Sequence, residues 1–141
     1  MKDSLIKQQI IDHPIDVIWS AITNAEEISS WFLKTDFKPD VGYNYTFNST
    51  GENCSPITGE IKQASPYTLV YTWIVVENPV ETLVTWKLED INGKTKLTLE
   101  HSGISSYESA TAIEMFNSFN NGWDNCLNGL TEYLSTAINA K

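Results

Sequence analysis

The sequence predicts an α+β fold in which an antiparallel sheet packs against one long C-terminal helix. Residues 42–101 consist of strand-like segments separated by turn signals, whereas residues 107–138 show one continuous helical pattern. An amphipathic helix that follows a run of antiparallel strands can bury its apolar stripe by lying across that sheet. The length of 141 residues is typical of one domain, so we expect a single domain over residues 1–141.

The N-terminal segment predicts one strand followed by two short helices. The strand is expected at residues 4–11. Pro14 then opens a helix, because the missing N–H of proline is not needed at the first helical position. Asn24 and Glu27 have the spacing of a capping box, which starts a second helix that ends near residues 31–32.

Five further strands with period-two alternation are expected along the middle of the chain. Their ranges are 43–48, 57–62, 69–75, 83–88 and 95–101. Turns are expected at Ser65–Pro66 and Asn78–Pro79, and Asn92–Gly93 predicts a two-residue type I′ hairpin, since both positions of that turn need positive φ. Alternation places one set of side chains toward the helix: Tyr43, Tyr45, Phe47, Ile57, Gly59, Ile61, Leu69, Tyr71, Trp73, Val84, Trp86, Leu88, Leu97, Leu99 and His101.

The C-terminal helix carries an apolar stripe at steps of three and four residues. The stripe consists of Phe116, Phe119, Trp123, Leu127, Leu130, Leu134 and Ile138. Gly122 and Gly129 lie beside it, and each costs about 1 kcal/mol relative to alanine in a helix interior. Two interpretations are open: the glycines leave room for a ligand, or they allow close packing against a neighbouring element.

The composition argues against binding of nucleic acids and anionic membranes. The net charge is −9, and all nine basic residues are lysines, so the chain lacks the arginine fork that recognises phosphates and guanine edges. The N-terminus lacks the apolar region of a secretory signal, and the longest apolar stretch is too short to span a bilayer. Cys54 and Cys126 have no metal-ligand spacing and are expected to be reduced, small apolar residues of a cytoplasmic protein.

The inward side chains combine aliphatic residues with three tyrosines, two tryptophans and a histidine. The polar atoms of such rings need hydrogen-bond partners once they are buried. A concave, mostly apolar surface with a few polar groups is typical of a small-molecule site. The pattern therefore predicts a pocket between sheet and helix, and the competing interpretation is a solid core in which these rings pack against the helix.

A family resemblance rests on segments that together cover nearly the whole chain. The segments are residues 13–19, 30–32, 59–61, 69–73, 93–103 and 121–123, with the leucines that follow the last one. They resemble the START-like, or SRPBCC, superfamily, and within it the branch named after the activator of a heat-shock chaperone's ATPase (AHSA-like). The resemblance implies a helix-grip (START/Bet v-like) fold. In that fold a curved antiparallel sheet of about six or seven strands wraps around the long helix and a hydrophobic cavity, and two short helices after the first strand close one end.

Members of this superfamily bind lipids, sterols, polyketides and other apolar molecules. The resemblance and the aromatic inward face lead us to expect a non-catalytic carrier or sensor of a small hydrophobic or aromatic molecule. The candidate ligand-binding residues are Trp31, Phe32, Tyr45, Phe47, Ile61, Tyr71, Trp73, Trp86, Leu88, Leu99, His101, Phe119 and Trp123. We expect no cofactor, no metal, no nucleic acid and no membrane insertion, and a monomer or homodimer.

An enzyme and an interaction module are the alternatives. His101 points by strand parity into the expected cavity and would act as general acid or base in a polyketide cyclase, dehydratase or hydrolase. His13 stands at a helix start, where an exposed or capping role is favoured. Glu60, Glu89 and Glu100 alternate outward, so the inward face lacks a carboxylate pair, and the chain has no phosphate-binding loop or nucleophile elbow. The second alternative is a chaperone-associated module whose apolar groove holds a protein partner.

Overall fold

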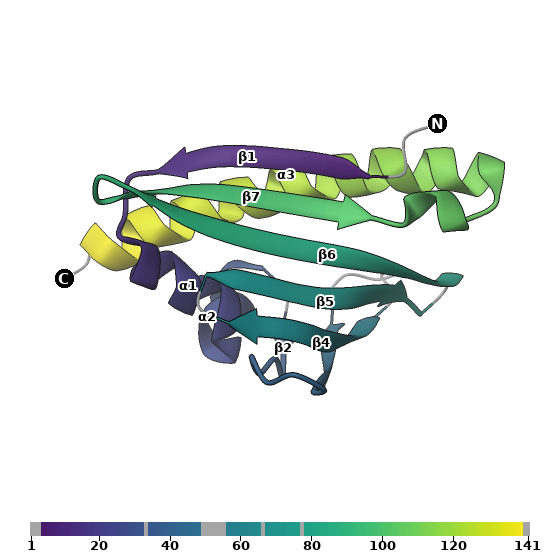
Figure 1. Ribbon diagram of the computed structural model, residues 1–141, viewed down its shortest axis with the longest axis horizontal. Helices are drawn as coiled ribbons and strands as arrows, with labels where there is room; N and C mark the ends of the chain where they lie inside the picture. Colours follow the sequence, from purple (N-terminus) through teal and green to yellow (C-terminus); the bar gives the residue numbers. More distant parts are fainter. Residues whose placement is uncertain (1–3, 33, 49–55, 66, 77, 140–141) are drawn as a thin grey trace.

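A computed structural model describes residues 4–32, 34–48, 56–65, 67–76 and 78–139 (Figure 1). Its elements are β1 (Leu5–Ile11), α1 (Ile15–Thr23), α2 (Ala25–Trp31), β2 (Lys34–Thr35), β3 (Asn44–Asn48), β4 (Ile57–Ser65), β5 (Thr68–Val75), β6 (Asn78–Ile91), β7 (Lys94–Ser102), a 3₁₀ turn (Ile104–Ser106) and α3 (Ser109–Asn139). The described strands form one seven-stranded antiparallel sheet of order β1-β7-β6-β5-β4-β3-β2. The prediction of an α+β helix-grip fold is confirmed.

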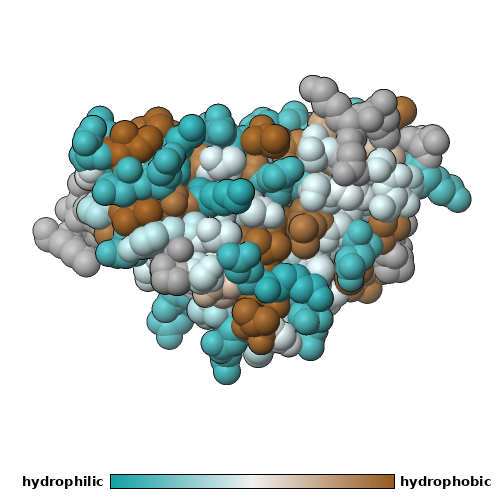
Figure 2. Space-filling view, viewed as in Figure 1, coloured by the Kyte–Doolittle hydropathy of each residue, from teal (hydrophilic) through white to brown (hydrophobic). Residues whose placement is uncertain are grey.

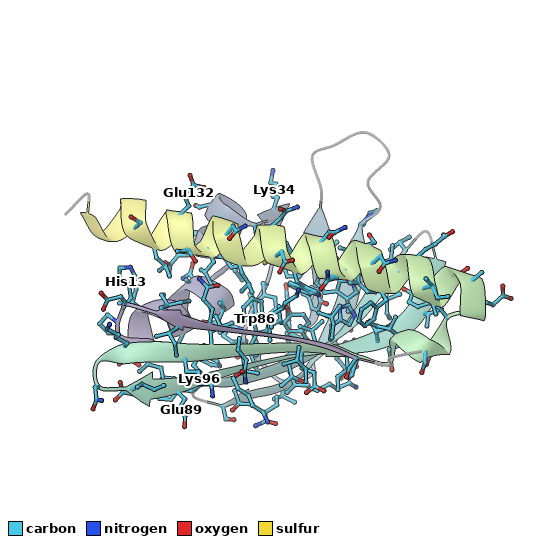
Figure 3. All side chains as sticks on the ribbon, turned by 90° about the horizontal axis from the view of Figure 1, so that it is seen from above. His13, Lys34, Trp86, Glu89, Lys96 and Glu132 are labelled. Carbon is cyan, nitrogen blue, oxygen red and sulfur yellow. The ribbon has the colours of Figure 1, made fainter. Side chains whose placement is uncertain are left out.

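The layers follow the predicted arrangement. Helix α3 crosses one face of the sheet, and α1 and α2 lie near the C-terminal half of α3 (Figure 1). Seen from above, Trp86 lies between sheet and helix, whereas Glu89 and Lys96 project from the opposite face (Figure 3). On that outer face hydrophobic residues are separated by hydrophilic ones (Figure 2). No described helix is both long and apolar enough to cross a membrane.

Period-two alternation placed the inward side chains correctly. In β7 every second residue is buried, and the inward residues of β5 and β6 are buried as well. Tyr43 and Ile57 are half-buried. Asn92 and Gly93 have φ values of 53° and 88°, which confirms the type I′ turn between β6 and β7.

Gly59 shows why one inward position has no side chain. A Cβ there would lie 1.9 Å from the backbone oxygen of Thr72 on the neighbouring strand. The same oxygen accepts a hydrogen bond from the buried hydroxyl of Tyr45. Because position 59 has no side chain, the Tyr45 hydroxyl can reach the backbone of β5. Its buried O–H donor is thereby paired.

The expected turn at Asn78–Pro79 is wrong, because both residues belong to β6. Val75 pairs with Asn78 in the register of β5 and β6. Pairing of β6 with β7 starts only at Leu83, so the first residues of β6 have no partner on that side among the described strands. A proline, which lacks an N–H, is tolerated in such an edge segment.

The predicted capping box of α2 is half formed. The side chain of Asn24 accepts a hydrogen bond from the backbone N–H of Glu27 at 3.2 Å, as expected for the first residue before a helix. The Glu27 carboxylate does not reach back to Asn24. It accepts hydrogen bonds from the hydroxyls of Ser20 and Tyr133 and so links α1, α2 and α3.

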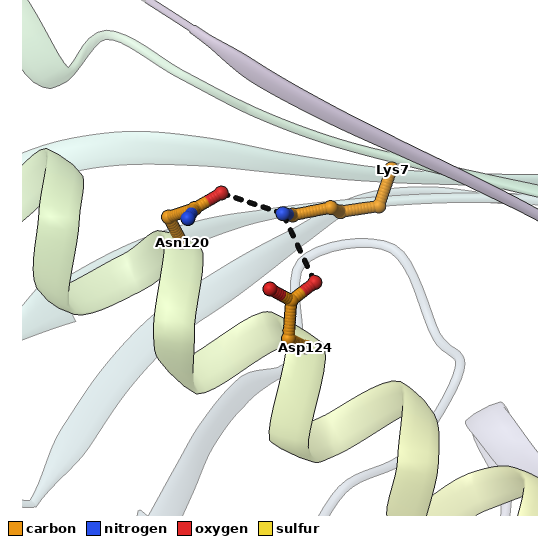
Figure 4. Close-up of polar contacts among 3 residues, drawn as sticks. All are labelled: Lys7, Asn120 and Asp124. Carbon is orange, nitrogen blue, oxygen red and sulfur yellow. Dashed lines mark hydrogen bonds and ion pairs between the residues drawn. The ribbon is translucent and has the colours of Figure 1, made fainter.

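Helix α3 is also attached to the edge strand β1. The ammonium group of Lys7 donates to the side-chain oxygen of Asn120 and forms an ion pair with Asp124 at 3.0 Å (Figure 4). Farther along, the Gln9 amide donates to the hydroxyl of Thr131 at 2.9 Å. These contacts hold the helix against the sheet through polar groups at the edge of its buried stripe.

Candidate functional site

A pocket of about 280 Å³ lies between the N-terminal half of α3 and the end of the sheet where β5 stops. Its lining residues are Phe32, Ile57, Trp73, Val75, Met115, Ser118, Phe119, Gly122 and Trp123. Ile57 and Val75 are a paired position of β4 and β5, so the two strands present one wall together. Ser118 and Gly122 are exposed to solvent, which places the mouth of the pocket beside α3.

Four of the thirteen candidate ligand-binding residues line this pocket: Phe32, Trp73, Phe119 and Trp123. Eight others are buried in the core away from its lining: Tyr45, Phe47, Ile61, Tyr71, Trp86, Leu88, Leu99 and His101. The remaining candidate, Trp31, is half-buried, and its indole N–H donates to the backbone oxygen of Ala21 at 2.9 Å. Along most of its length, the space between sheet and helix is therefore a packed core.

Phe37 explains why three of the candidate residues lie in solid core outside the pocket. This residue precedes β3, is 2% exposed and follows no periodic pattern. Its ring packs against those of Tyr45, Phe47 and Tyr71, with centroid distances of 5.5, 6.1 and 5.6 Å. An irregular segment thus fills the part of the sheet where three candidate ligand-binding residues lie.

Five lining residues were not among the candidates: Ile57, Val75, Met115, Ser118 and Gly122. Ile57 belongs to the inward set, and Val75 shares the face of Trp73 by alternation, so both carried a signal. Met115, Ser118 and Gly122 lie at helical spacing with Phe119 and form one face of α3. That face adjoins the apolar stripe, and Gly122 was its one signal, whereas the pattern did not distinguish Met115 and Ser118 from solvent-exposed positions.

The two helix glycines have different roles. A Cβ on Gly122 would meet nothing within 4 Å, and this residue lines the pocket, so its missing side chain leaves space at the mouth. A Cβ on Gly129 would lie 3.0 Å from the backbone oxygen of Trp31. Gly122 therefore leaves space at the pocket mouth, and Gly129 allows close packing against the chain at Trp31.

His101 is buried and both of its ring nitrogens are engaged. Its Nδ1 accepts from the indole N–H of Trp123 at 2.9 Å, and its Nε2 lies 2.7 Å from the hydroxyl of Thr82. Because the indole can only donate, Nδ1 carries no proton, so the neutral ring donates from Nε2 to Thr82. Thr82 in turn donates to the backbone oxygen of Trp73 at 2.9 Å. Burial lowers the pKa of His101 to about 3, so the ring is neutral near pH 7.

The network makes His101 a positioning residue for the pocket wall. It holds Trp123 by a hydrogen bond, and its ring stacks on Phe119 with a centroid distance of 4.3 Å. Both partners line the pocket, whereas His101 does not. With no accessible ring nitrogen, His101 is poorly suited to act as a general base.

The described part of the pocket has little catalytic equipment. Its lining holds no charged residue and one hydroxyl, that of Ser118. Cys126 is buried, and burial raises the pKa of its thiol, so it is not a thiolate nucleophile. Cys54 lies outside the described residues. No group of three or more His, Cys, Asp or Glu side chains in the described ranges could hold a metal ion.

Comparisons with known proteins agree with the fold. A family model described as "Activator of Hsp90 ATPase homolog 1-like protein" matches residues 12–135. Among solved structures, the chain is similar to protein MLL2253 from Mesorhizobium loti, with 25% identity, a TM-score of 0.84, and 94% and 97% of the two chains covered. CalU16 from Micromonospora echinospora is 27% identical, with a TM-score of 0.73 and coverage of 93% and 73%.

A third similar structure is DynU16, a protein of the dynemicin biosynthetic locus, with 20% identity and a TM-score of 0.82. The match covers 97% of this chain and 49% of DynU16, so the chain spans about half the length of that protein. No curated protein matches the sequence significantly. The family match supports a ligand-binding domain in general and indicates no particular ligand or activity, and the similar structures agree with the fold.

Proposed function

With the family model matching residues 12–135, this chain belongs to the Activator of Hsp90 ATPase homolog 1-like family, and we propose that it is a non-catalytic carrier or sensor that binds a small apolar or aromatic molecule. The observation that carries the proposal is the pocket of about 280 Å³ between β5 and α3. Its volume is near the lower end of the range for small-molecule sites, which favours a compact ligand.

The chemistry of the wall supports an apolar guest. Phe32, Trp73, Phe119 and Trp123 contribute aromatic rings, and Met115 adds a polarisable thioether. Transfer of an aromatic molecule from water to this surface is favourable because it removes apolar area from solvent. A charged group would lose its hydration there without finding a counter-charge in the lining.

The arrangement of His101 favours binding over catalysis. A cyclase, dehydratase or hydrolase of the kind considered above would need this ring at the pocket surface. Its two nitrogens instead bind Trp123 and Thr82 inside the core. We therefore expect bound molecules to be recovered chemically unchanged.

A matched pair of variants tests the proposal. Native mass spectrometry of the purified protein first identifies co-purified small molecules, and a thermal-shift panel of lipids and polycyclic aromatics then finds compounds that raise the melting temperature. Val75→Phe adds a ring at the pocket wall, whereas Val76→Phe adds the same ring at a neighbouring exposed position outside the lining. Only the first should abolish the thermal shift.

The outcomes are distinct. Equal thermal shifts in Val75→Phe and Val76→Phe would place the ligand elsewhere and contradict the proposed site. A flat panel with no co-purified compound would contradict small-molecule binding. Recovery of a heat-shock chaperone as the specific partner of the purified protein would then support the interaction module.

A further inference from the structure

We propose that the edge strand β1 is a self-association surface, where two copies of this chain pair their β1 strands antiparallel about Gln8 and join their sheets into one. Both copies contribute the same residues, Leu5–Ile11, so the contact is symmetric. This inference is independent of the proposed function, because no residue of β1 lines the pocket.

Of the two edges of the described sheet, only β1 is suited to pairing. At the opposite edge, β2 has two residues, too few to serve as a template. Strand β1 has seven residues and runs along the margin of the sheet (Figure 1). Among the described strands it pairs with β7 alone, so the backbone groups that point away from β7 have no strand partner. Such a row of N–H and C=O groups is a ready site for another strand.

Strand β1 also lacks the usual protection of an exposed edge. Natural edge strands are blocked by proline, by a bulge or by a charged side chain. This strand contains no proline, and its pairing with β7 is continuous over all seven residues. Its one charged side chain, Lys7, is turned toward α3, where it forms an ion pair with Asp124 at 3.0 Å (Figure 4). That charge is therefore compensated within its own chain.

The outward face of β1 is apolar on both sides of a central amide. The side chains of Lys7 and Gln9 contact α3, so alternation turns Ile6, Gln8 and Ile10 to the opposite face. Ile6 is 58% exposed and Ile10 is 54% exposed. Single exposed apolar residues are common on protein surfaces. These two, however, stand at equal spacing from Gln8, which makes the strand complementary to a second copy of itself.

One register satisfies the whole strand. A two-fold axis perpendicular to the sheet keeps outward residues opposite outward residues. Centred on Gln8, this register pairs every residue of β1 and places Ile6 of each copy opposite Ile10 of the other. The two Gln8 amides then face each other, and each can donate and accept. A register centred on Lys7 would oppose two lysines, and one centred on Gln9 would oppose each Ile10 to a glutamine.

The charges of the neighbouring strand agree with the same register. In β7, Glu100 stands beside Ile6 and Lys96 stands beside Ile10. Each row of two isoleucines in the dimer is therefore bordered by Glu100 of one copy and Lys96 of the second copy. Opposite charges on the two sides of the contact favour this orientation. The contact is small and the net charge of −9 repels a second copy, so the dimer is weak and forms only at high concentration.

The test exchanges the residue on the two-fold axis. Association is measured by sedimentation velocity at protein concentrations up to about 1 mM for the wild type, Gln8→Lys, Gln8→Glu and an equal mixture of these two variants. Gln63→Lys and Gln63→Glu are the matched controls, because they make the same changes at an exposed position of β4. The melting temperature of each variant at low concentration checks that the monomer folds.

We expect the wild type to dimerise and each Gln8 variant to associate about tenfold more weakly, because two like charges meet at the axis. The mixture should dimerise at least as tightly as the wild type, and the Gln63 variants should match the wild type. In spectra of the wild-type protein, the backbone amide signals of β1 should shift with concentration while those of α1 stay fixed, a readout that needs no variant.

Three results would overturn the proposal. The first is a wild-type protein that stays monomeric up to about 1 mM. The second is a dimer that the Gln8 and Gln63 variants affect equally, since the contact would then lie elsewhere or respond only to net charge. The third is a mixture of Gln8→Lys and Gln8→Glu that associates no better than either variant alone, which would exclude the register about Gln8.

Discussion

Acidification offers a sensitive test of the buried network around His101. The ring is fully buried, and burial lowers its pKa to about 3, whereas a histidine in the unfolded chain has its ordinary pKa near 6.5. Between these two values the unfolded state binds nearly one proton more than the folded state. Because the folded pKa is the lower one, the stabilising effect is complete above pH 6.5 and is lost as the pH falls.

The magnitude follows from the linkage relation. The contribution of His101 should lower the free energy of unfolding by up to about 1.4 kcal/mol per pH unit, which amounts to about 2 kcal/mol between pH 7 and pH 5. Within that interval the result depends on the ordinary pKa of the unfolded histidine. The folded pKa has no influence as long as it stays well below 5.

The assay is urea unfolding followed by tryptophan fluorescence at pH 7 and pH 5. His101→Gln should be less stable at pH 7, because Trp123 or Thr82 loses a buried partner, but its stability should fall about 2 kcal/mol less than that of the wild type on acidification. His13→Gln is the control. It removes the other histidine, which lies outside the hydrogen-bond network around His101, so an effect seen only in His101→Gln belongs to the buried ring.

Parallel pH dependences for the wild type and His101→Gln would refute the idea that the folded protein holds this ring neutral. A second measurement covers the case in which the variant does not fold. In the wild-type protein, the carbon-bound ring protons of His101 should show no titration in NMR spectra between pH 7 and pH 5.

Three further predictions concern packing. Gly122→Ala should raise the free energy of unfolding, measured in urea titrations, by about 1 kcal/mol. Gly129→Ala should give no such gain, because its Cβ would lie 3.0 Å from the backbone oxygen of Trp31. Equal gains in the two variants would contradict that close packing. Cys126 should resist alkylation in the native protein and react after unfolding, as followed by peptide mapping, since burial raises its pKa; rapid native labelling would show that the core opens. Lys7→Met should lower the free energy of unfolding, measured by urea titration, by only about 0.5–1 kcal/mol, because the ion pair with α3 is partly exposed. A loss of several kcal/mol would mean that the attachment of β1 to α3 depends on this ion pair.

The elements that sequence reasoning located share a strong periodic signal. Alternation along β5, β6 and β7 identified residues such as Trp86 and Leu99 as inward, because a strand turns every second side chain to the same face. The spacing of Trp123, Leu127 and Leu130 identified the buried stripe of α3 for the corresponding reason. Asn92–Gly93 identified its hairpin through a backbone requirement that few residue pairs meet.

The features that were missed or misplaced depend on contacts between distant segments. Strand β2 has only two residues, too few for any pattern. Pro79 belongs to β6, in a segment that has no partner on one side among the described strands and therefore tolerates proline. Which strand segments lack a partner is decided by sheet pairing and not by the local sequence. The Glu27 carboxylate accepts hydrogen bonds from the hydroxyls of Ser20 and Tyr133 instead of completing the capping box. Tyr133 is more than 100 residues away in the sequence.

The amino-acid sequence by itself determined the fold class, the order of the longer elements and the set of side chains between sheet and helix, because local periodicity sets which face of each element is apolar. The tertiary structure alone decided where that interface is solid and where it is hollow. Phe37 fills one part of it from an irregular segment, while the small side of α3 at Gly122 leaves another part open. A cavity is the volume left over after distant segments have packed, and no local pattern encodes that difference.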